Sequence, residues 1–153
     1  MITKEYKTAS PEETEALAKA IGERALTSGR RRLFIALFGE MGVGKTAFTR
    51  GFTAGVAPSA AVRSPTYTVV NEYRGGIIPV FHFDMYRIED YDDLASIGFS
   101  DYLASDGFIL CEWSENIVEE LPSDMLKITI LRDGDGTARR IITEGDGYED
   151  LMP

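Results

Sequence analysis

Residues 39–46 carry the pattern with the most definite chemistry in this sequence. They read Gly39-Glu40-Met41-Gly42-Val43-Gly44-Lys45-Thr46, which matches G-x-x-x-x-G-K-[ST] at every fixed position. The glycines let the backbone curl so that successive N–H groups point inward at phosphate oxygens. Lys45 is expected to reach the β- and γ-phosphates, and the Thr46 hydroxyl to bind Mg²⁺. The motif therefore predicts a site for a nucleotide and its magnesium ion.

The sequence favours adenine as the base of that nucleotide. P-loop proteins that are specific for guanine usually carry an Asn/Thr-Lys-x-Asp tetrad on a later loop, and the sequence contains no such tetrad. We therefore expect ATP rather than GTP.

Two acidic residues follow apolar runs that are expected to be strands. Asp84 comes after residues 79–83, and Glu112 comes after residues 108–111. If both strands run parallel to the strand before the P-loop, both carboxylates emerge at its carboxyl edge, where open α/β sheets bind ligands. One acid would hold Mg²⁺, directly or through a water, and the other would orient or activate the attacking water. The residues alone leave open which acid does which.

Two neighbours of these acids have side chains that suit a role at the site. His82 is the only histidine, and strand alternation places its side chain on the same side as that of Asp84. We expect it to hydrogen bond within the core or to the nucleotide pocket. Trp113 follows Glu112 directly, and both packing and a platform beside the site remain open for it.

The elements that position the P-loop are a strand and the two longest predicted helices. Residues 33–38 form a continuous apolar run, as expected for a strand that is buried on both faces. A helix is expected from residue 45 to residue 54, stopped by Gly55. Ser10-Pro11-Glu12-Glu13 predicts the start of another helix, through a capping box and a proline at the first helical position, and Gly29 is expected to end it.

The rest of the chain predicts a mixed sheet. Strands are expected at residues 2–8, 67–73, 77–83, 108–111, 125–132 and 137–143, with helix-like pieces within residues 89–106 and a short helix that Ser114 caps and that ends before Pro122. Hairpins are indicated by the turns at residues 74–76 and 133–136. This order predicts an α/β fold, a P-loop NTPase-like mixed sheet with helices on both faces in three layers.

Length and composition restrict the kinds of protein that this chain can be. The 153 residues suit a single domain, which we place at residues 1–153. With a net charge of −9, the chain repels polyanions, so direct binding of DNA or RNA by this chain itself is not expected. The single cysteine, the lack of a signal-peptide pattern and the lack of a long apolar run favour a cytoplasmic protein without a membrane segment.

The motif set resembles the bacterial TsaE (YjeE) ATPase family. Four motifs carry the resemblance: the P-loop, Ser64-Pro65-Thr66-Tyr67, His82-Phe83-Asp84-Met85-Tyr86-Arg87 and Glu112-Trp113-Ser114-Glu115. Their order and spacing agree from about residue 8 to residue 120. A P-loop alone is shared by many families, whereas the second and third motifs between a P-loop and a Glu-Trp pair are highly specific.

The resemblance implies a role in making threonylcarbamoyladenosine at position 37 of tRNA. It implies an ATPase with weak intrinsic activity, with Mg²⁺ as cofactor and ATP as substrate. Its implied partners are the proteins TsaD and TsaB, which would stimulate the activity and hold the tRNA. ATP hydrolysis would then reset the TsaD/TsaB complex between turnovers, and an acidic subunit suits a system in which the partners contact the tRNA.

The resemblance also implies roles for individual residues. Lys45, Asp84 and Glu112 would be catalytic, and Thr46 and Glu112 would be the Mg²⁺ ligands. Residues Ser64, Pro65, Thr66 and Tyr67 would form a switch-like loop that senses the γ-phosphate. The implied nucleotide-binding residues are Glu40, Met41, Gly42, Val43, Gly44, Lys45, Thr46, Ala47 and Glu115.

Two other functions are compatible with a P-loop in a chain of this size. A small-molecule kinase usually closes an arginine-bearing lid over the phosphates, whereas residues 89–107 are acidic, which suits an anionic transition state poorly. A non-catalytic nucleotide switch would signal through Ser64–Tyr67 without hydrolysis. Asp84 and Glu112 argue against this second alternative, because a switch of that kind needs no water-activating acid.

Overall fold

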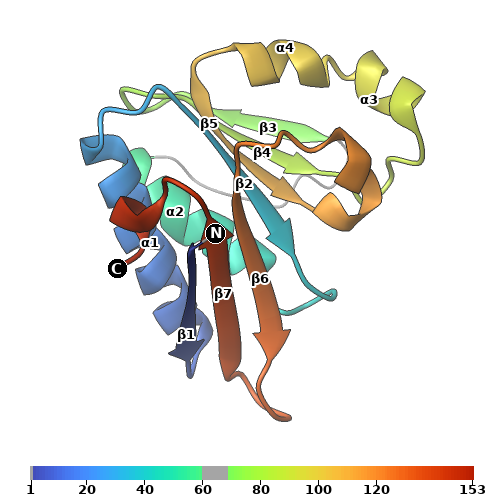
Figure 1. The fold of residues 1–153 in the computed structure, drawn as a ribbon. Helices are drawn as coiled ribbons and strands as arrows, with labels where there is room; N and C mark the ends of the chain where they lie inside the picture. The colour runs from blue at the N-terminus through green and yellow to red at the C-terminus, as the bar shows by residue number, and fades with distance from the viewer. Residues whose placement is uncertain (1, 60–68) are drawn as a thin grey trace.

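A twisted mixed sheet forms the middle of the molecule (Figure 1). The computed structural model describes residues 2–59 and 69–153. In these residues the sheet has seven strands in the order β1-β7-β6-β2-β5-β4-β3. The strands are β1 (Ile2–Thr8), β2 (Arg32–Phe38), β3 (Val70–Tyr73), β4 (Val80–Asp84), β5 (Gly107–Glu112), β6 (Leu126–Arg132) and β7 (Arg139–Gly145).

The four central strands run parallel. Strand β5 pairs in parallel with both β2 and β4, and β6 pairs in parallel with β2. The outer strands β3, β7 and β1 are antiparallel to their neighbours, so the two expected hairpins are confirmed. The carboxyl ends of β2, β4 and β5 consequently meet at one edge of the sheet, and Asp84 and Glu112 are register partners there.

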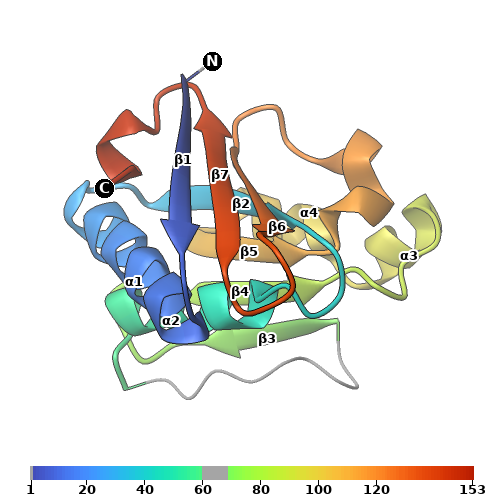
Figure 2. The ribbon, with the colours of Figure 1, turned by 90° about the horizontal axis from the view of Figure 1, so that it is seen from below.

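Helices cover both faces of the sheet, as Figures 1 and 2 show from two directions. Helices α1 (Pro11–Thr27) and α2 (Lys45–Val56) lie on one face, with the short 3₁₀ helix η2 (Glu149–Leu151). The other face carries α3 (Tyr91–Ser96), α4 (Phe99–Ala104) and the 3₁₀ helix η1 (Ser114–Glu120). The three-layer α/β fold is therefore confirmed. Of the helices in the described residues, none has both the length and the apolar character to cross a membrane.

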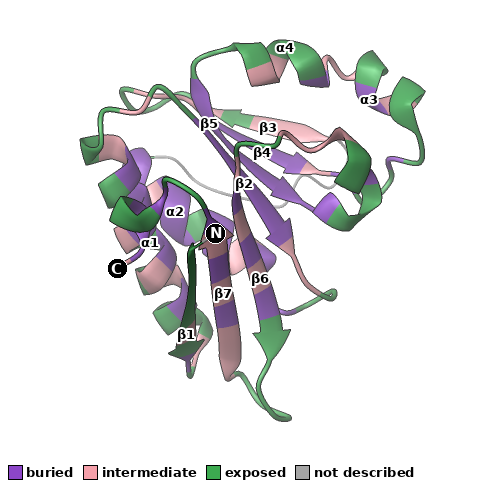
Figure 3. Ribbon diagram, viewed as in Figure 1, coloured by how far each residue is buried: buried purple, intermediate pink, exposed green. Residues whose placement is uncertain are grey.

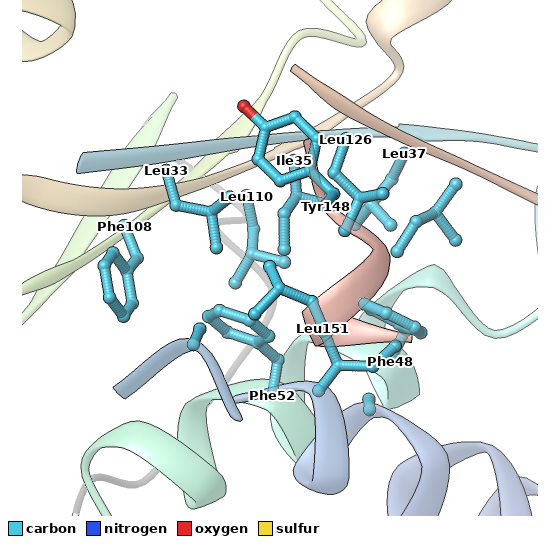
Figure 4. Close-up of a cluster of buried hydrophobic side chains, with 14 of the residues drawn as sticks. Leu33, Ile35, Leu37, Phe48, Phe52, Phe108, Leu110, Leu126, Tyr148 and Leu151 are labelled. Atoms are coloured by element: carbon cyan, nitrogen blue, oxygen red, sulfur yellow. The ribbon is translucent and has the colours of Figure 1, made fainter. Parts of the chain in front are cut away.

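The two faces of β2 explain why the sequence forms two cores. Leu33, Ile35 and Leu37 point toward α1 and α2, whereas the intervening Phe34 and Ala36 point toward α4 and η1. Figure 4 shows the first core, in which Phe48 and Phe52 of α2 rise toward the sheet. Burying each such side chain contributes about 1.5–3 kcal/mol. Strands β2, β4 and β5 are consequently buried along most of their length, whereas β6 ends in exposed residues and β1 at the edge is largely exposed (Figure 3).

The start of α1 confirms one expectation in detail, and two other helix ends differ from expectation. Ser10 Oγ accepts a hydrogen bond from the Glu13 amide at 3.2 Å, with Pro11 at the first helical position. Gly55, however, does not stop α2, which continues to Val56. Ser114 does not cap η1, because its hydroxyl donates to the carbonyl of Cys111 at 2.7 Å and Trp113 stands at the cap position.

Gly51 allows α2 to pack tightly against α1. A Cβ at this position would overlap the backbone of Glu15 in α1, and a Cβ at Gly55 would overlap the carbonyl oxygen of Lys19. We expect Gly51→Ala to lower the free energy of unfolding by about 3 kcal/mol, since overpacking forces the two backbones apart. Urea unfolding measures this change. Gly136→Ala, in an exposed turn with open space around the glycine, is the matched control; an equal loss in both variants would contradict the packing argument.

Candidate nucleotide-binding site

The P-loop connects the central strand of the sheet to a buried helix. Strand β2 ends at Phe38, residues 39–44 form the loop, and α2 begins at Lys45. Gly44 precedes the helix without a side-chain cap, so the first amides of α2 have no such partner. Free amides and the helix dipole at this end favour an anion.

Glycine is required at two loop positions because the backbone is left-handed there. The φ angle is 79° at Gly42 and 112° at Gly44, values that a side chain at Cβ disfavours. Val43, between them, is buried in the core that α2 forms with the sheet. The buried valine fixes the loop to the core while the two glycines turn it.

The side chain of Lys45 extends along the P-loop toward its first residue, Gly39. Its Nζ donates to the carbonyl of Gly39 at 2.7 Å and lies 3.8 Å from the centroid of the Trp113 ring. Burial lowers the pKa of Lys45, and the negative charges of Glu115, Glu112 and Asp84 oppose that change. The site therefore holds a cation with little exposure to water, surrounded by carboxylates.

Asp84 and Glu112 lie side by side at the carboxyl edge, as their strand-end positions predict. They are register partners on β4 and β5, and Glu112 Oε2 contacts His82 Nε2. His82 and Glu112 are both buried, and His82 Nδ1 has no hydrogen-bond partner in the described residues. His82 therefore restrains the carboxylate of Glu112 from the core side, so the buried histidine side chain bonds to a residue that lines the pocket, in agreement with the expectation of a hydrogen bond within the core or to the pocket.

Burial is the main influence on the pKa of Asp84, which it raises. Glu112 also raises this pKa, whereas the Tyr86 amide, which donates to Asp84 Oδ1 at 3.0 Å, and the cation of Lys45 lower it. A carboxylate held in this way is a better proton acceptor than an exposed aspartate. Asp84 thus has the chemical character that a general base or a water-positioning acid requires.

Trp113 and Glu115 bring η1 against the P-loop. Trp113 has a φ angle of 58°, and it is the only residue besides glycine with positive φ in the described part of the chain. Its ring stacks at a tilt on Tyr86, with centroids 5.0 Å apart. Glu115 accepts a hydrogen bond from the Gly39 amide at 3.1 Å. The Trp113 ring therefore packs against Tyr86 and also forms part of the wall of the site, while its role as a platform stays a prediction.

A pocket of about 400 Å³ brings together seven of the eleven predicted site residues that the structure describes. It is lined by Met41, Gly42, Gly44, Lys45, Thr46, Asp84, Tyr86, Glu112 and Trp113. Glu40 is exposed on the outer side of the loop, and Ala47 is half-buried on the first turn of α2. Residues Ser64, Pro65, Thr66 and Tyr67 lie outside the described residues.

The donor set at this pocket fits a magnesium ion that is bound together with phosphates. Thr46, Asp84 and Glu112 supply hydroxyl and carboxylate oxygens, which Mg²⁺ prefers. Within residues 2–59 and 69–153, no group of three or more His, Cys, Asp or Glu side chains could hold a metal by itself. Such a site suits Mg²⁺, which usually binds through one or two protein ligands, substrate phosphates and waters.

Sequence reasoning missed three residues that support the site. Arg132 Nη2 donates to the Met41 carbonyl at 3.0 Å, and Arg139 Nε donates to the Val43 carbonyl at 2.9 Å. Asn116 Nδ2 donates to the Met85 carbonyl at 2.8 Å and so holds the segment after Asp84. No local motif marks these residues, because each acts through a backbone carbonyl that is distant in sequence.

Comparison with known proteins gives a consistent result over nearly the whole chain. A family model described as "Threonylcarbamoyl adenosine biosynthesis protein TsaE" matches residues 8–141. A tRNA threonylcarbamoyladenosine biosynthesis protein TsaE from Bacillus subtilis is 38% identical over 147 residues, covering 95% of this chain and 89% of that protein. Proteins of the same name from Nostoc sp. and Aquifex aeolicus are 33% and 36% identical, covering 88% and 85% of this chain and 82% and 90% of their own lengths.

A solved structure shows the same arrangement. The crystal structure of Bacillus subtilis YdiB superposes with a TM-score of 0.78 at 33% sequence identity. The superposition covers 98% of this chain and 91% of that chain. The similarity in fold therefore extends over nearly the whole chain.

Proposed function

Because this chain belongs to the TsaE family, we propose that it is the ATP-hydrolysing subunit of tRNA threonylcarbamoyladenosine synthesis. In this proposal it binds Mg-ATP and acts with TsaD and TsaB in the cytoplasm. Hydrolysis resets the TsaD/TsaB complex between turnovers, and those partners, rather than this acidic chain, hold the tRNA.

One observation carries the hydrolytic part of the proposal. Five residues of the P-loop and two strand-end carboxylates line a single pocket at the carboxyl edge of the parallel central strands. The loop supplies amides and Lys45 for the phosphates, and Asp84 supplies a carboxylate with raised pKa for a water molecule. A protein that only bound nucleotide would need the loop amides and Lys45 but would not need the carboxylate of Asp84.

Each residue has a definite task in the proposed reaction. The loop amides and Lys45 bind the β- and γ-phosphates and offset the negative charge that spreads over the γ-phosphate oxygens. Asp84 orients the attacking water and accepts its proton. Thr46 and Glu112 would hold Mg²⁺, with His82 restraining Glu112. When bound, the ion neutralises phosphate charge.

Incubation of the purified protein with [γ-³²P]ATP tests the proposal. We expect slow release of inorganic phosphate from the protein alone, since the family resemblance implies weak intrinsic activity that the partners stimulate. TsaD and TsaB together are expected to raise the rate at least about tenfold, corresponding to about 1.4 kcal/mol of barrier. Lys45→Ala serves as the control for contaminating ATPases.

Two outcomes of this incubation would contradict the proposal. Labelled γ-phosphate that appears on a metabolite instead of as free phosphate would establish the kinase alternative. Tight ATP binding without any phosphate release, with or without TsaD and TsaB, would establish the non-catalytic switch.

A further inference from the structure

Two arginines of the β6–β7 hairpin hold the outer side of the P-loop. Arg132 stands at the end of β6 and donates to the carbonyl of Met41, and Arg139 stands at the start of β7 and donates to the carbonyl of Val43. The Arg139 guanidinium is further fixed, because its Nη1 donates to the carbonyls of Gly136 and Ala138 at 2.8 Å each. A hairpin at the far end of the chain thus grips two alternate peptide groups of the loop.

The direction of these bonds determines where the loop amides point. In a trans peptide the C=O of one residue and the N–H of the next point in opposite directions, and the described residues contain no cis peptide bond. Holding the Met41 and Val43 carbonyls on the hairpin side therefore turns the Gly42 and Gly44 amides toward the pocket side. Both glycines line the 400 Å³ pocket.

The two glycines of the loop make a restraint on its backbone necessary. Gly42 and Gly44 can adopt many backbone conformations at little cost, so the loop could turn its amides away from the pocket when no phosphate is present. A charged donor on a carbonyl forms one of the stronger hydrogen bonds in a protein. Two such bonds on alternate peptides would limit the loop to the conformation that binds phosphate.

We propose that Arg132 and Arg139 are positioning residues that preorganise the P-loop for the polyphosphate by fixing the Met41 and Val43 carbonyls. This inference rests on the proposed binding of ATP at the loop. The arginines act through the loop backbone and do not touch the nucleotide. Their removal therefore weakens binding of the phosphate groups that the loop holds, and leaves the rest of the site unchanged.

Three variants at β7 separate this role from a simple charge effect. Arg139→Met removes the donor at similar side-chain volume. Arg139→Gln restores a neutral N–H donor at the same distance along the side chain as Nε. Arg140→Met removes an equal charge from the next residue, whose guanidinium contacts Glu5 and not the loop.

Calorimetric titration with ADP is the first measurement. We expect Arg139→Met to weaken ADP binding about tenfold, while Arg139→Gln and Arg140→Met stay within about twofold of the unmodified protein. AMP, which lacks the phosphates that the loop holds, should lose less affinity in Arg139→Met than ADP does. If the ADP affinity of Arg139→Gln is as low as that of Arg139→Met, the arginine acts by its charge and the proposal is wrong.

Amide NMR of the nucleotide-free protein gives a second readout. The Gly42 and Gly44 resonances are expected to broaden or shift in Arg139→Met and to recover in Arg139→Gln; resonances that stay unchanged would overturn the proposal. Should Arg139→Met fail to fold, Arg132→Met, at an exposed position, carries the same test. If the unmodified protein binds no ADP, the proposed function fails instead, and this result is distinct from unchanged affinity in the variants.

Discussion

Lys45→Ala is expected to abolish tight binding of Mg-ATP. The lysine is buried beside the loop, and in the proposed site its ammonium group is the cation that contacts the phosphates. Removing a charged hydrogen-bond donor from such a site costs about 1.5–3 kcal/mol per bond, so we expect at least about a 100-fold loss of affinity. Thr46→Ala is expected to lose Mg-ATP in the same way but to retain weak binding of metal-free nucleotide.

The fold should survive this change, so the loss can be measured directly. Burial lowers the pKa of Lys45, which means that its charge is unfavourable in the nucleotide-free protein. Calorimetry gives the affinity, and the fluorescence of Trp113, the only tryptophan, gives an independent signal because Lys45 lies over its ring. Lys127→Ala, which removes an equal charge from β6, is the control. Unchanged affinity in Lys45→Ala would place the nucleotide elsewhere.

The part of the site that the sequence predicts consists of local patterns. A P-loop must follow a strand and open a helix, and residues 39–46 do both. Asp84 and Glu112 could be brought together from sequence because each ends an apolar run, and parallel strands place such ends at a common edge. These inferences need only the period of a strand and the direction of its neighbours.

The arginine contacts could not be predicted in this way. Arg132 and Arg139 reach loop carbonyls that lie 91 and 96 positions earlier in the chain. The contacts exist because β2 has β5 on one side and β6 on the other. The strand that follows β2 in sequence, β3, lies at the edge of the sheet instead. Every residue type has a backbone carbonyl, so a side chain that donates to a carbonyl does not restrict the type of its partner. No sequence motif therefore indicates these contacts.

The two helix-end errors have a different cause. Gly55 near the end of α2 suits a helix stop and close packing equally well, because both depend on the missing Cβ. The neighbouring helix decides between them, and a Cβ at this position would overlap the carbonyl oxygen of Lys19. Ser114 was expected to cap η1, but its hydroxyl bonds backward to Cys111. A serine has several backbone partners within reach, and sequence does not choose among them.

Asp84→Asn is expected to separate ATP binding from hydrolysis. The substitution keeps the size of the side chain and an oxygen that can accept from the Tyr86 amide, so the loop after β4 should be retained. We expect Mg-ATP affinity within about threefold of the unmodified protein, and phosphate release lower by at least about 100-fold, the range usual for loss of a general base. Calorimetry and [γ-³²P]ATP hydrolysis measure the two quantities on the same preparation.

The pKa of Asp84 gives this assignment an independent check. Burial, and then the charge of Glu112, raise it above the ordinary 3.8. ¹³C NMR of the metal-free protein should therefore show Asp84 titrating above that value, and Glu112→Gln should lower its pKa because a negative neighbour is lost. The proposed mechanism requires ionised Asp84, so we expect hydrolysis to decline on acidification at a higher pH than that at which an exposed aspartate becomes protonated. Undiminished phosphate release in Asp84→Asn would show that Asp84 does not activate the water. Glu112 would then be assigned that role, and Asp84 would be assigned to the metal.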